Sequence, residues 1–338
     1  MRTVKTVLVL FVLISLVQAF AQEVVNVYTA RHYDSDDELF AMFTEQTGIR
    51  VNKIESSAAE LVVRIKSEGA NSPADVLITV DASNLWRADQ EELFQPIQSD
   101  VLDAAIPPNL RHPDGHWFGL ATRARVIVYN KEAVEPSDLS TYEDLATDTW
   151  KNRICIRSST NVYNQSLLAS LVASLGLEAA EAWAKAVVNN MARPPQGGDT
   201  DQIKAVAAGE CDLAVVNHYY LARLIASEDE ADNRVADKVG IFFPNQQERG
   251  AHINISGAGV VKDAPNLENA VAFIEFLVSP EAQKIFADQN NEFPVVDRIA
   301  PSPQTESFGE FKVDEVSVAS YGEYNLQVVQ IFDRVGWR

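Results

Sequence analysis

The run WFGLATRARVIVYN, from Trp117 to Asn130, is a long strand-like segment with no clear turn signal inside it. A strand of this length reaches beyond one small sheet, so we expect it to pass from one lobe of the protein to another. A second apolar run, Ile253 to Val261, predicts a strand that carries the chain back to the first lobe. Together the two runs predict two lobes joined by crossing strands.

Strand and helix patterns alternate on both sides of these runs. Val24–Thr29 and Ile49–Ile54 are strand-like, and Asp34–Thr47 between them predicts a helix with acidic residues in its first turn and a glycine just past its end. Ser57 and Glu60 form a capping box that predicts the next helix. Further strands are expected at 75–79, around 155, at 212–216 and at 239–243, and further helices at about 162–175, 178–190, 200–208, from 218, at 266–278 and at 280–289. This alternation is typical of α/β proteins whose parallel or mixed sheets are covered by helices.

The predicted organisation is two α/β lobes with a ligand cleft between them, since ligands bind outside the carboxyl ends of parallel strands. We expect the following segments: a signal peptide at 1–21, the first part of lobe 1 at 22–121, lobe 2 at 122–250, the return part of lobe 1 at 251–298, and a C-terminal helical segment packing on lobe 2 at 299–338.

The N-terminus has the pattern of a secretory signal peptide. Arg2 and Lys5 form a basic start, Val7–Val17 is an almost unbroken apolar run, and Ala19-Phe20-Ala21 fits the small-residue cleavage pattern. The apolar run is too short to span a bilayer, and no later stretch approaches the ~20 apolar residues of a membrane helix. We therefore expect cleavage near Ala21, an exported protein and no stable membrane insertion.

Composition and charge describe an ordinary globular chain. Of its 338 residues, 46% are hydrophobic and 22% are charged, and the formal net charge is −20. Such acidity argues against nucleic acid as a partner, because phosphates require lysine and arginine. It favours the attraction of cations, but acidity alone does not identify a site.

The chain has two cysteines, Cys155 and Cys211, and each lies in an apolar strand-like run. In an oxidising compartment, adjacent buried strands would bring the two thiols within reach of a disulfide. The alternative is that both are small buried hydrophobic residues. The residues by themselves leave this choice open.

Four of the nine tyrosines lie in suggestive places. Tyr33, Tyr163 and the pair Tyr219-Tyr220 each stand between a predicted strand and a predicted helix, at the edge that faces the cleft. Tyr163 follows Cys155 by eight positions, and Tyr219 follows Cys211 by eight positions. We therefore expect the two strand-to-helix units to present their tyrosines at similar heights. The other tyrosines singled out are expected to be core or rim residues: Tyr28, Tyr129 and Tyr142.

A group of phenols suits Fe(III) better than other metals. Phenol has a pKa near 10, and a small, hard, triply charged ion favours anionic oxygen and drives the phenol's deprotonation. Three phenolates neutralise Fe(III), and a fourth leaves a net negative charge that a nearby cation would balance. Arg223 lies one helical turn after Tyr219, and Arg123 lies in the predicted crossing strand. Neither guanidinium can ligate a metal, so their expected contribution is electrostatic.

Four motifs resemble the periplasmic ferric-binding proteins of ABC iron importers, sometimes called bacterial transferrins. They are Asn-x-Tyr-Tyr at 217–220, Tyr-x-x-Arg-His-Tyr at 28–33, Ser-Ser-x-Asn-x-Tyr-Asn-Gln-Ser at 158–166 and Asn-Glu-Phe-Pro-Val at 291–295. The likeness covers nearly the whole chain after the predicted signal peptide and is greatest to the cyanobacterial-type (Fut-like) branch.

This resemblance implies the class II periplasmic binding protein fold, a monomer and delivery of iron to a permease in the inner membrane. It also implies a set of iron ligands: Tyr33, Tyr163, Tyr219 and Tyr220, with His32 as a further candidate. In this branch the site uses several tyrosines and needs no synergistic anion. The expected ion is Fe(III), with Fe(II) as the alternative oxidation state.

Other functions fit the sequence less well. A binder with the same fold for a small organic cation or an oxyanion, such as a polyamine or phosphate, is one alternative. An exported hydrolase that uses a metal-bound water is another, but nucleotide-binding, zinc-protease and serine-hydrolase motifs are missing from the sequence. The turn Gly197-Gly198-Asp199 is either an anion cradle or a plain loop and cap. The remaining histidines are expected to be surface or capping residues: His112, His116, His218 and His252.

Overall fold

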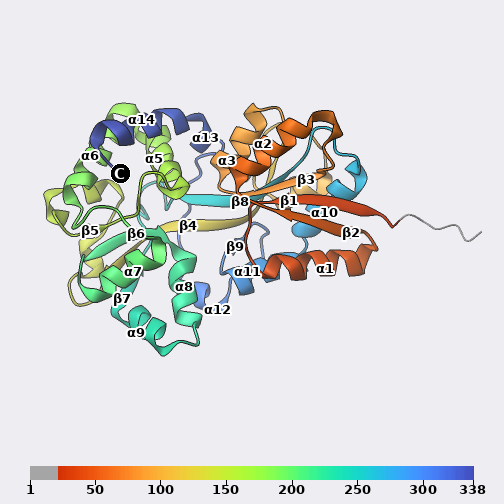
Figure 1. The fold of residues 1–338 in the computed structure, drawn as a ribbon. Helices are drawn as coiled ribbons and strands as arrows, with labels where there is room; N and C mark the ends of the chain where they lie inside the picture. The colour runs from red at the N-terminus through yellow and green to blue at the C-terminus, as the bar shows by residue number, and fades with distance from the viewer. Residues whose placement is uncertain (1–21) are drawn as a thin grey trace, which may run out of the picture.

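The computed structural model describes residues 22–338, so the predicted signal peptide lies outside the described residues. Two α/β halves are joined by the long strands β4 (Phe118–Asn130) and β8 (Ile253–Val260), as Figure 1 shows. This arrangement confirms the predicted fold class of two lobes joined by crossing strands. No helix within 22–338 is long and apolar enough to cross a membrane.

Strand β4 changes its partners halfway along its length. Phe118–Ala124 pairs with β8, whereas Arg125–Asn130 pairs with β6 (Leu213–Asn217) and β7 (Val239–Phe242). The sheet order is β2-β1-β3-β8-β4-β6-β5, with β7 and the two-residue strand β9 (Phe293–Pro294) also on β4. Nearly all of β4 and β8 is buried, as expected for strands covered on both faces.

The first half is built on β1 (Val24–Thr29), which is parallel to both β2 (Arg50–Glu55) and β3 (Val76–Val80). Its helices are α1 (Ser35–Thr47), α2 (Ala58–Glu68), α3 (Ala82–Gln90), α4 (Asp100–Ala105), α10 (Leu267–Leu277) and α11 (Pro280–Asn290). The capping box of Ser57 and Glu60 is present at the start of α2, as predicted. Gly48 ends α1 with φ 77°, a left-handed conformation that favours glycine.

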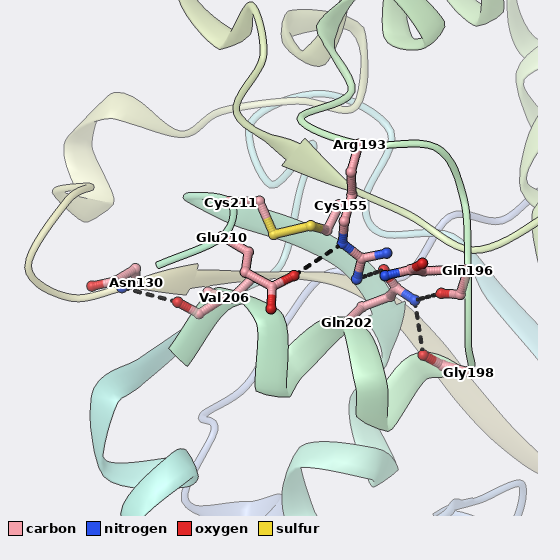
Figure 2. Close-up of a disulfide and its surroundings, with 9 residues drawn as sticks. All are labelled: Asn130, Cys155, Arg193, Gln196, Gly198, Gln202, Val206, Glu210 and Cys211. Atoms are coloured by element: carbon pink, nitrogen blue, oxygen red, sulfur yellow. Dashed lines mark hydrogen bonds and ion pairs between the residues drawn. A yellow bond between two sulfur atoms is a disulfide. The ribbon is translucent and has the colours of Figure 1, made fainter. Parts of the chain in front are cut away.

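The second half carries the short strand β5 (Ile154–Cys155), which is parallel to β6. Its helices are α5 (Val162–Leu175), α6 (Leu177–Asn190), α7 (Asp199–Ala208), α8 (His218–Ala226) and α9 (Glu230–Lys238). Cys155 and Cys211 form a disulfide, with their Cα atoms 5.8 Å apart, so the first of the two alternatives is confirmed. Figure 2 shows the bond beside the ion pair of Arg193 and Glu210, whose nitrogen and oxygen are 3.3 Å apart.

The C-terminal segment contributes α12 (Pro303–Glu306), α13 (Ser320–Glu323) and α14 (Asn325–Val335). Helix α14 packs against α5 and α6, while α13 packs against both α3 and α5 and so touches both halves. Short 3₁₀ segments are found at Gly69–Asn71, Pro108–Leu110, Pro136–Asp138, Glu143–Ala146 and Asp148–Trp150. The limits of the lobes proposed from the sequence stay a prediction.

Helices α3 and α9 are absent from the sequence-based prediction, although each has an aspartate cap. The Asp81 carboxylate accepts the Ser83 N–H at 3.0 Å, and the Asp229 carboxylate accepts the Ala231 N–H at 2.8 Å. Asp81 also ties the halves together, because the Ser166 hydroxyl of α5 donates to its carboxylate at 2.7 Å. Asp81 and Ser166 are both fully buried, so this contact between the two halves lies inside the molecule.

Candidate metal centre

Three of the predicted ligands stand in the first turns of two helices of the second half. Tyr163 is the second residue of α5, and its backbone N–H donates to the Asn161 side chain that caps this helix, at 3.0 Å. Tyr219 and Tyr220 are the second and third residues of α8. Because β5 and β6 are parallel neighbours, the two helices begin at the same edge of the sheet.

The tyrosine side chains meet as the equal spacing from the two cysteines predicts. The hydroxyl of Tyr219 lies 3.3 Å from that of Tyr163, and the rings of Tyr219 and Tyr220 are 4.4 Å apart between centroids. The side-chain amide of Asn217 donates to the Tyr219 hydroxyl at 3.3 Å. We call Tyr33, Tyr163, Tyr219 and Tyr220 the tyrosine cluster.

Tyr33 reaches this cluster from the first half of the molecule. It follows β1 on the segment that leads into α1. The Arg223 guanidinium carbon lies 5.2 Å from the Tyr33 ring centroid, 4.8 Å from that of Tyr219 and 5.7 Å from that of Tyr220. Arg223 therefore packs on three of the four tyrosines, one from the first half of the molecule and two from the second, and each such contact stabilises the cation over an aromatic face.

Arg123 lies on the other side of the cluster, in β4. Its side chain is only 2% exposed, and its guanidinium carbon is 5.5 Å from the Tyr163 ring centroid. One of its nitrogens, Nη1, donates to Ser256 Oγ at 3.1 Å, while Nε and Nη2 have no hydrogen-bond partner among the described residues. Two unpartnered buried donors are costly, and an anion formed beside them would be stabilised.

Burial raises the pKa of Tyr33, Tyr163 and Tyr219 above the ordinary value for a phenol. The Glu292 carboxylate raises the pKa of Tyr33 further, whereas the Arg123 guanidinium opposes the rise in pKa at Tyr163 and Tyr219. All three side chains are thus neutral phenols near pH 7 in the empty cluster. A bound cation of high charge is what would convert them to phenolates.

His32 is the predicted ligand that the structure does not bring to the cluster. Its side chain is 58% exposed, and its Nδ1 lies 2.6 Å from the Glu55 carboxylate. His32 therefore points toward Glu55 and away from the cluster, although it precedes Tyr33 directly, because consecutive residues of an extended segment face opposite sides.

Glu292 is a buried carboxylate of the site that the sequence analysis did not single out, although it lies in the quoted Asn-Glu-Phe-Pro-Val motif. It lies 3.1 Å from Arg31 Nη1 and 3.7 Å from Arg123 Nη1. Arg31 also pairs with Asp36 at 3.0 Å and stacks 4.7 Å from the Tyr33 ring centroid.

Asp199 is a second buried anchor. Its carboxylate accepts hydrogen bonds from Arg125 Nη1 at 2.7 Å and from the backbone N–H of Asn217 at 2.9 Å. These bonds hold the strand that precedes Tyr219. Because the carboxylate itself satisfies these donors, the structure favours the plain-loop interpretation of the Gly197-Gly198-Asp199 turn over an anion cradle.

The expectation that the remaining histidines are surface or capping residues is wrong for His218 and His252, which are both buried. His218 Nδ1 accepts the backbone N–H of Ala124 at 3.2 Å, and its Nε2 lies 2.8 Å from the Asn291 carbonyl oxygen. Burial lowers the pKa of His218 to about 4, so the ring is neutral. It holds the start of α8 against β4. Tyr28, Tyr129 and Tyr142 are buried, as expected for core residues.

Comparison with known proteins relates the chain to one family. A family model described as bacterial extracellular solute-binding protein matches residues 38–313. The chain is 55% identical over 317 residues to the iron uptake protein A1 of Synechocystis, an alignment that covers 94% of this chain and 88% of that protein.

Solved structures give the same result. A Trichodesmium protein (IdiA, FutA) in complex with iron and citrate superposes with a TM-score of 0.91 and 57% identity, covering 93% of this chain and 100% of that one. The ferric binding protein from Campylobacter jejuni superposes with a TM-score of 0.87 and 45% identity, again over 93% of this chain and 100% of that one.

Proposed function

This chain belongs to the bacterial extracellular solute-binding proteins, among the ferric-iron-binding members of that family, and on this premise we propose that it captures Fe(III) with the tyrosine cluster. The observation that supports the proposal is the meeting of four phenols from both halves of the molecule: Arg223 packs on Tyr33, Tyr219 and Tyr220, and the hydroxyl of Tyr163 lies against that of Tyr219. No softer or less charged metal ion requires so many hard anionic oxygens.

The proposed ligands are Tyr33, Tyr163, Tyr219 and Tyr220. Four phenolates around Fe(III) carry one net negative charge, and the guanidinium of Arg223, which packs on three of the four rings, offsets it. The unpartnered nitrogens of Arg123 do the same from the Tyr163 side. A water molecule, or His32 after its release from Glu55, completes the coordination shell.

The crossing strands suit a capture mechanism by hinge closure. Tyr33 belongs to the half built on β1, and the other three ligands belong to the half that contains β6, so bending at β4 and β8 brings the ligand sets together. Closure would add Tyr33 to the ligands of the other half and so hold the ion more tightly. Reduction to Fe(II) or protonation of the phenolates would weaken the hard anionic ligation and release it.

In this proposal the protein acts in the periplasm as a monomer and delivers its iron to the permease of an ABC importer. It is a transport protein and not an enzyme, in agreement with the family to which it belongs. We propose that no synergistic anion is needed, because the four phenolates already more than balance the charge of the ion. The Trichodesmium structure was obtained with citrate as well as iron, so the experiment below is run with and without citrate.

A visible absorption titration tests the proposal. The purified, metal-stripped protein is titrated with Fe(III), and we expect a red or orange phenolate-to-iron band that saturates at about one ion per chain. The band should weaken or disappear in Tyr219→Phe and Tyr163→Phe and persist in the control Tyr129→Phe, whose side chain lies outside the cluster. A colourless protein that ignores iron but gains thermal stability with phosphate or a polyamine would overturn the iron assignment in favour of an organic cation or oxyanion.

A further inference from the structure

A second group of metal-ligating side chains lies outside the cleft. One ligand atom each from Asp89, His112 and His116 lies within 4.8 Å of the others. Within residues 22–338 this is the one group of three histidine, cysteine or acidic side chains that meets this distance. None of the three belongs to the tyrosine cluster or to the groups that surround it.

The fold holds the two histidines on a tight turn. The backbone N–H of His112 donates to the Trp117 carbonyl at 2.9 Å, and the N–H of Gly115 donates to the His112 carbonyl at 3.0 Å. Gly115 has φ 76°, and a Cβ atom there would overlap the Ile97 carbonyl oxygen, so the turn requires glycine. Trp117 is fully buried and anchors the end of the turn. The backbone positions from which the two imidazoles project are therefore fixed by the turn.

Both imidazoles face the carboxylate of Asp89, in the last turn of α3. His116 Nδ1 contacts Asp89 Oδ1, and His112 Nε2 lies 3.5 Å from Oδ2. The two rings are stacked, with centroids 4.5 Å apart and an interplanar angle of 4°. The side chains of Asp89, His112 and His116 are 12%, 16% and 28% exposed, so the group is partly buried yet open to solvent.

The carboxylate of Asp89 has no lysine or arginine against it among the described residues; its recorded ion-pair partners are the two imidazoles. The adjacent Arg111 pairs with Asp103 instead. A partly buried carboxylate between two imidazoles has two interpretations. It either forms hydrogen bonds that connect α3 to the turn, or it is a ligand of a metal ion together with the imidazoles. The types of ligand atom indicate which metal ions such a site would bind.

Two imidazole nitrogens and one carboxylate oxygen suit borderline divalent ions such as Zn(II), Cu(II) and Ni(II), whereas hard Fe(III) prefers the phenolates of the cleft. We propose that Asp89, His112 and His116 form a second metal site that binds a divalent transition-metal ion, with water at the remaining position. The strongly acidic chain, with a net charge of −20, favours cations over its whole surface.

Metal binding requires a change of tautomer at His112. His112 Nδ1 accepts the backbone N–H of Asp114 at 3.1 Å, so in the empty site its Nε2 carries the proton. An ion at Nε2 requires that proton to move to Nδ1, so that the imidazole stays neutral. A proton on Nδ1 replaces the hydrogen bond from Asp114, which is exposed and can bond to water instead.

The test is a calorimetric titration of the iron-free protein with Zn(II), repeated on the iron-loaded protein. We expect one site whose affinity falls about 100-fold or more in the double variant His112→Gln/His116→Gln, since even partners that only orient metal ligands change affinity by about 10–100-fold. Asp89→Asn should weaken binding less, and Asp114→Asn, a carboxylate on the same turn, should leave it unchanged. Iron loading should not compete, because the two sites are separate.

Equal Zn(II) affinity in the double variant, competition by iron or the lack of any Zn(II) binding would each overturn the proposal. Retention of the iron absorption band in the double variant verifies that it is folded. If that variant does not fold, Cu(II) electron paramagnetic resonance of the unmutated, iron-loaded protein decides the question: coupling to two imidazole nitrogens supports the site, and oxygen-only ligation refutes it.

Discussion

The two halves of the molecule contribute very unequally to the tyrosine cluster. The half with β5 and β6 supplies three tyrosines from two neighbouring helix starts, and these side chains already touch one another. The half built on β1 supplies Tyr33 alone, which reaches the others through Arg223. The difference suggests a division of labour in which one half holds a preassembled set of ligands and the other closes over it.

Rigidity follows the same division. The ligand-rich half is crosslinked by the Cys155–Cys211 disulfide next to β5 and β6, and the start of α8 is held by His218 and by Asp199 through Asn217. On the other side, Arg31 stands between Asp36 and Glu292 and supports the segment of Tyr33. We therefore expect substitutions in the ligand-rich half to abolish capture and those around Tyr33 to affect retention.

The largest effect is expected for Tyr219→Phe. This change removes a phenol that touches Tyr163 and packs on Tyr220, and we expect Fe(III) affinity to fall by about 100-fold or more, which is close to 3 kcal/mol. Competition with a coloured chelator measures the affinity, and Tyr129→Phe is the matched control. An affinity within threefold or so of the unmutated protein would remove Tyr219 from the ligand set.

Tyr33→Phe is expected to have a smaller and kinetically distinct effect. If the other three tyrosines capture the ion first, the loss of Tyr33 should weaken binding by about tenfold, mainly through faster dissociation. Stopped-flow transfer of iron to a chelator measures this rate. A loss as large as that of Tyr219→Phe, or one confined to the association rate, would contradict the division of labour between the halves.

Removal of the disulfide should affect stability more than iron affinity. In Cys155→Ala/Cys211→Ala the free energy of unfolding should fall by about 2–5 kcal/mol, because the unfolded chain is no longer crosslinked. Iron affinity should change by only about a few-fold, since hydrogen bonds still position Tyr163 and Tyr219. Denaturant unfolding of the iron-free protein and the chelator assay measure the two quantities, and reduction of the unmutated protein should reproduce the variant's stability.

The smallest expected difference is in proton release. Burial raises the pKa of Tyr33, Tyr163 and Tyr219 above that of an ordinary phenol, so each is protonated near neutral pH and loses a proton when it binds iron. Iron affinity should therefore fall as pH falls, and Tyr33→Phe should release about one proton fewer per ion. Titration of the same ferric chelate in weak buffer counts the protons. Equal release by the variant and the unmutated protein would mean that Tyr33 is not a ligand.

Much of the fold could be predicted from local patterns. The boundaries of α1 and α2 follow from Gly48 and from the capping box of Ser57 and Glu60, which act within a few residues of chain. The long strand-like run of β4, with no turn signal inside it, predicts a strand that crosses between the halves, and nearly all of it is buried. Helix α3 was missed, since its cap, Asp81, owes its position to burial against Ser166 and Asn254 as much as to local sequence.

The amino-acid sequence by itself determined the two-lobe plan and the placing of four tyrosines at strand-to-helix junctions, because hydrophobic period, caps and motif spacing are local properties. Only the tertiary structure decided the pairing of the two cysteines, the meeting of Tyr33 with Arg223 and the turning of His32 toward Glu55. It also revealed the approach of Asp89 to two histidines of a distant turn. These contacts join residues far apart in the chain or depend on which way one side chain points, and neither is encoded in a local pattern.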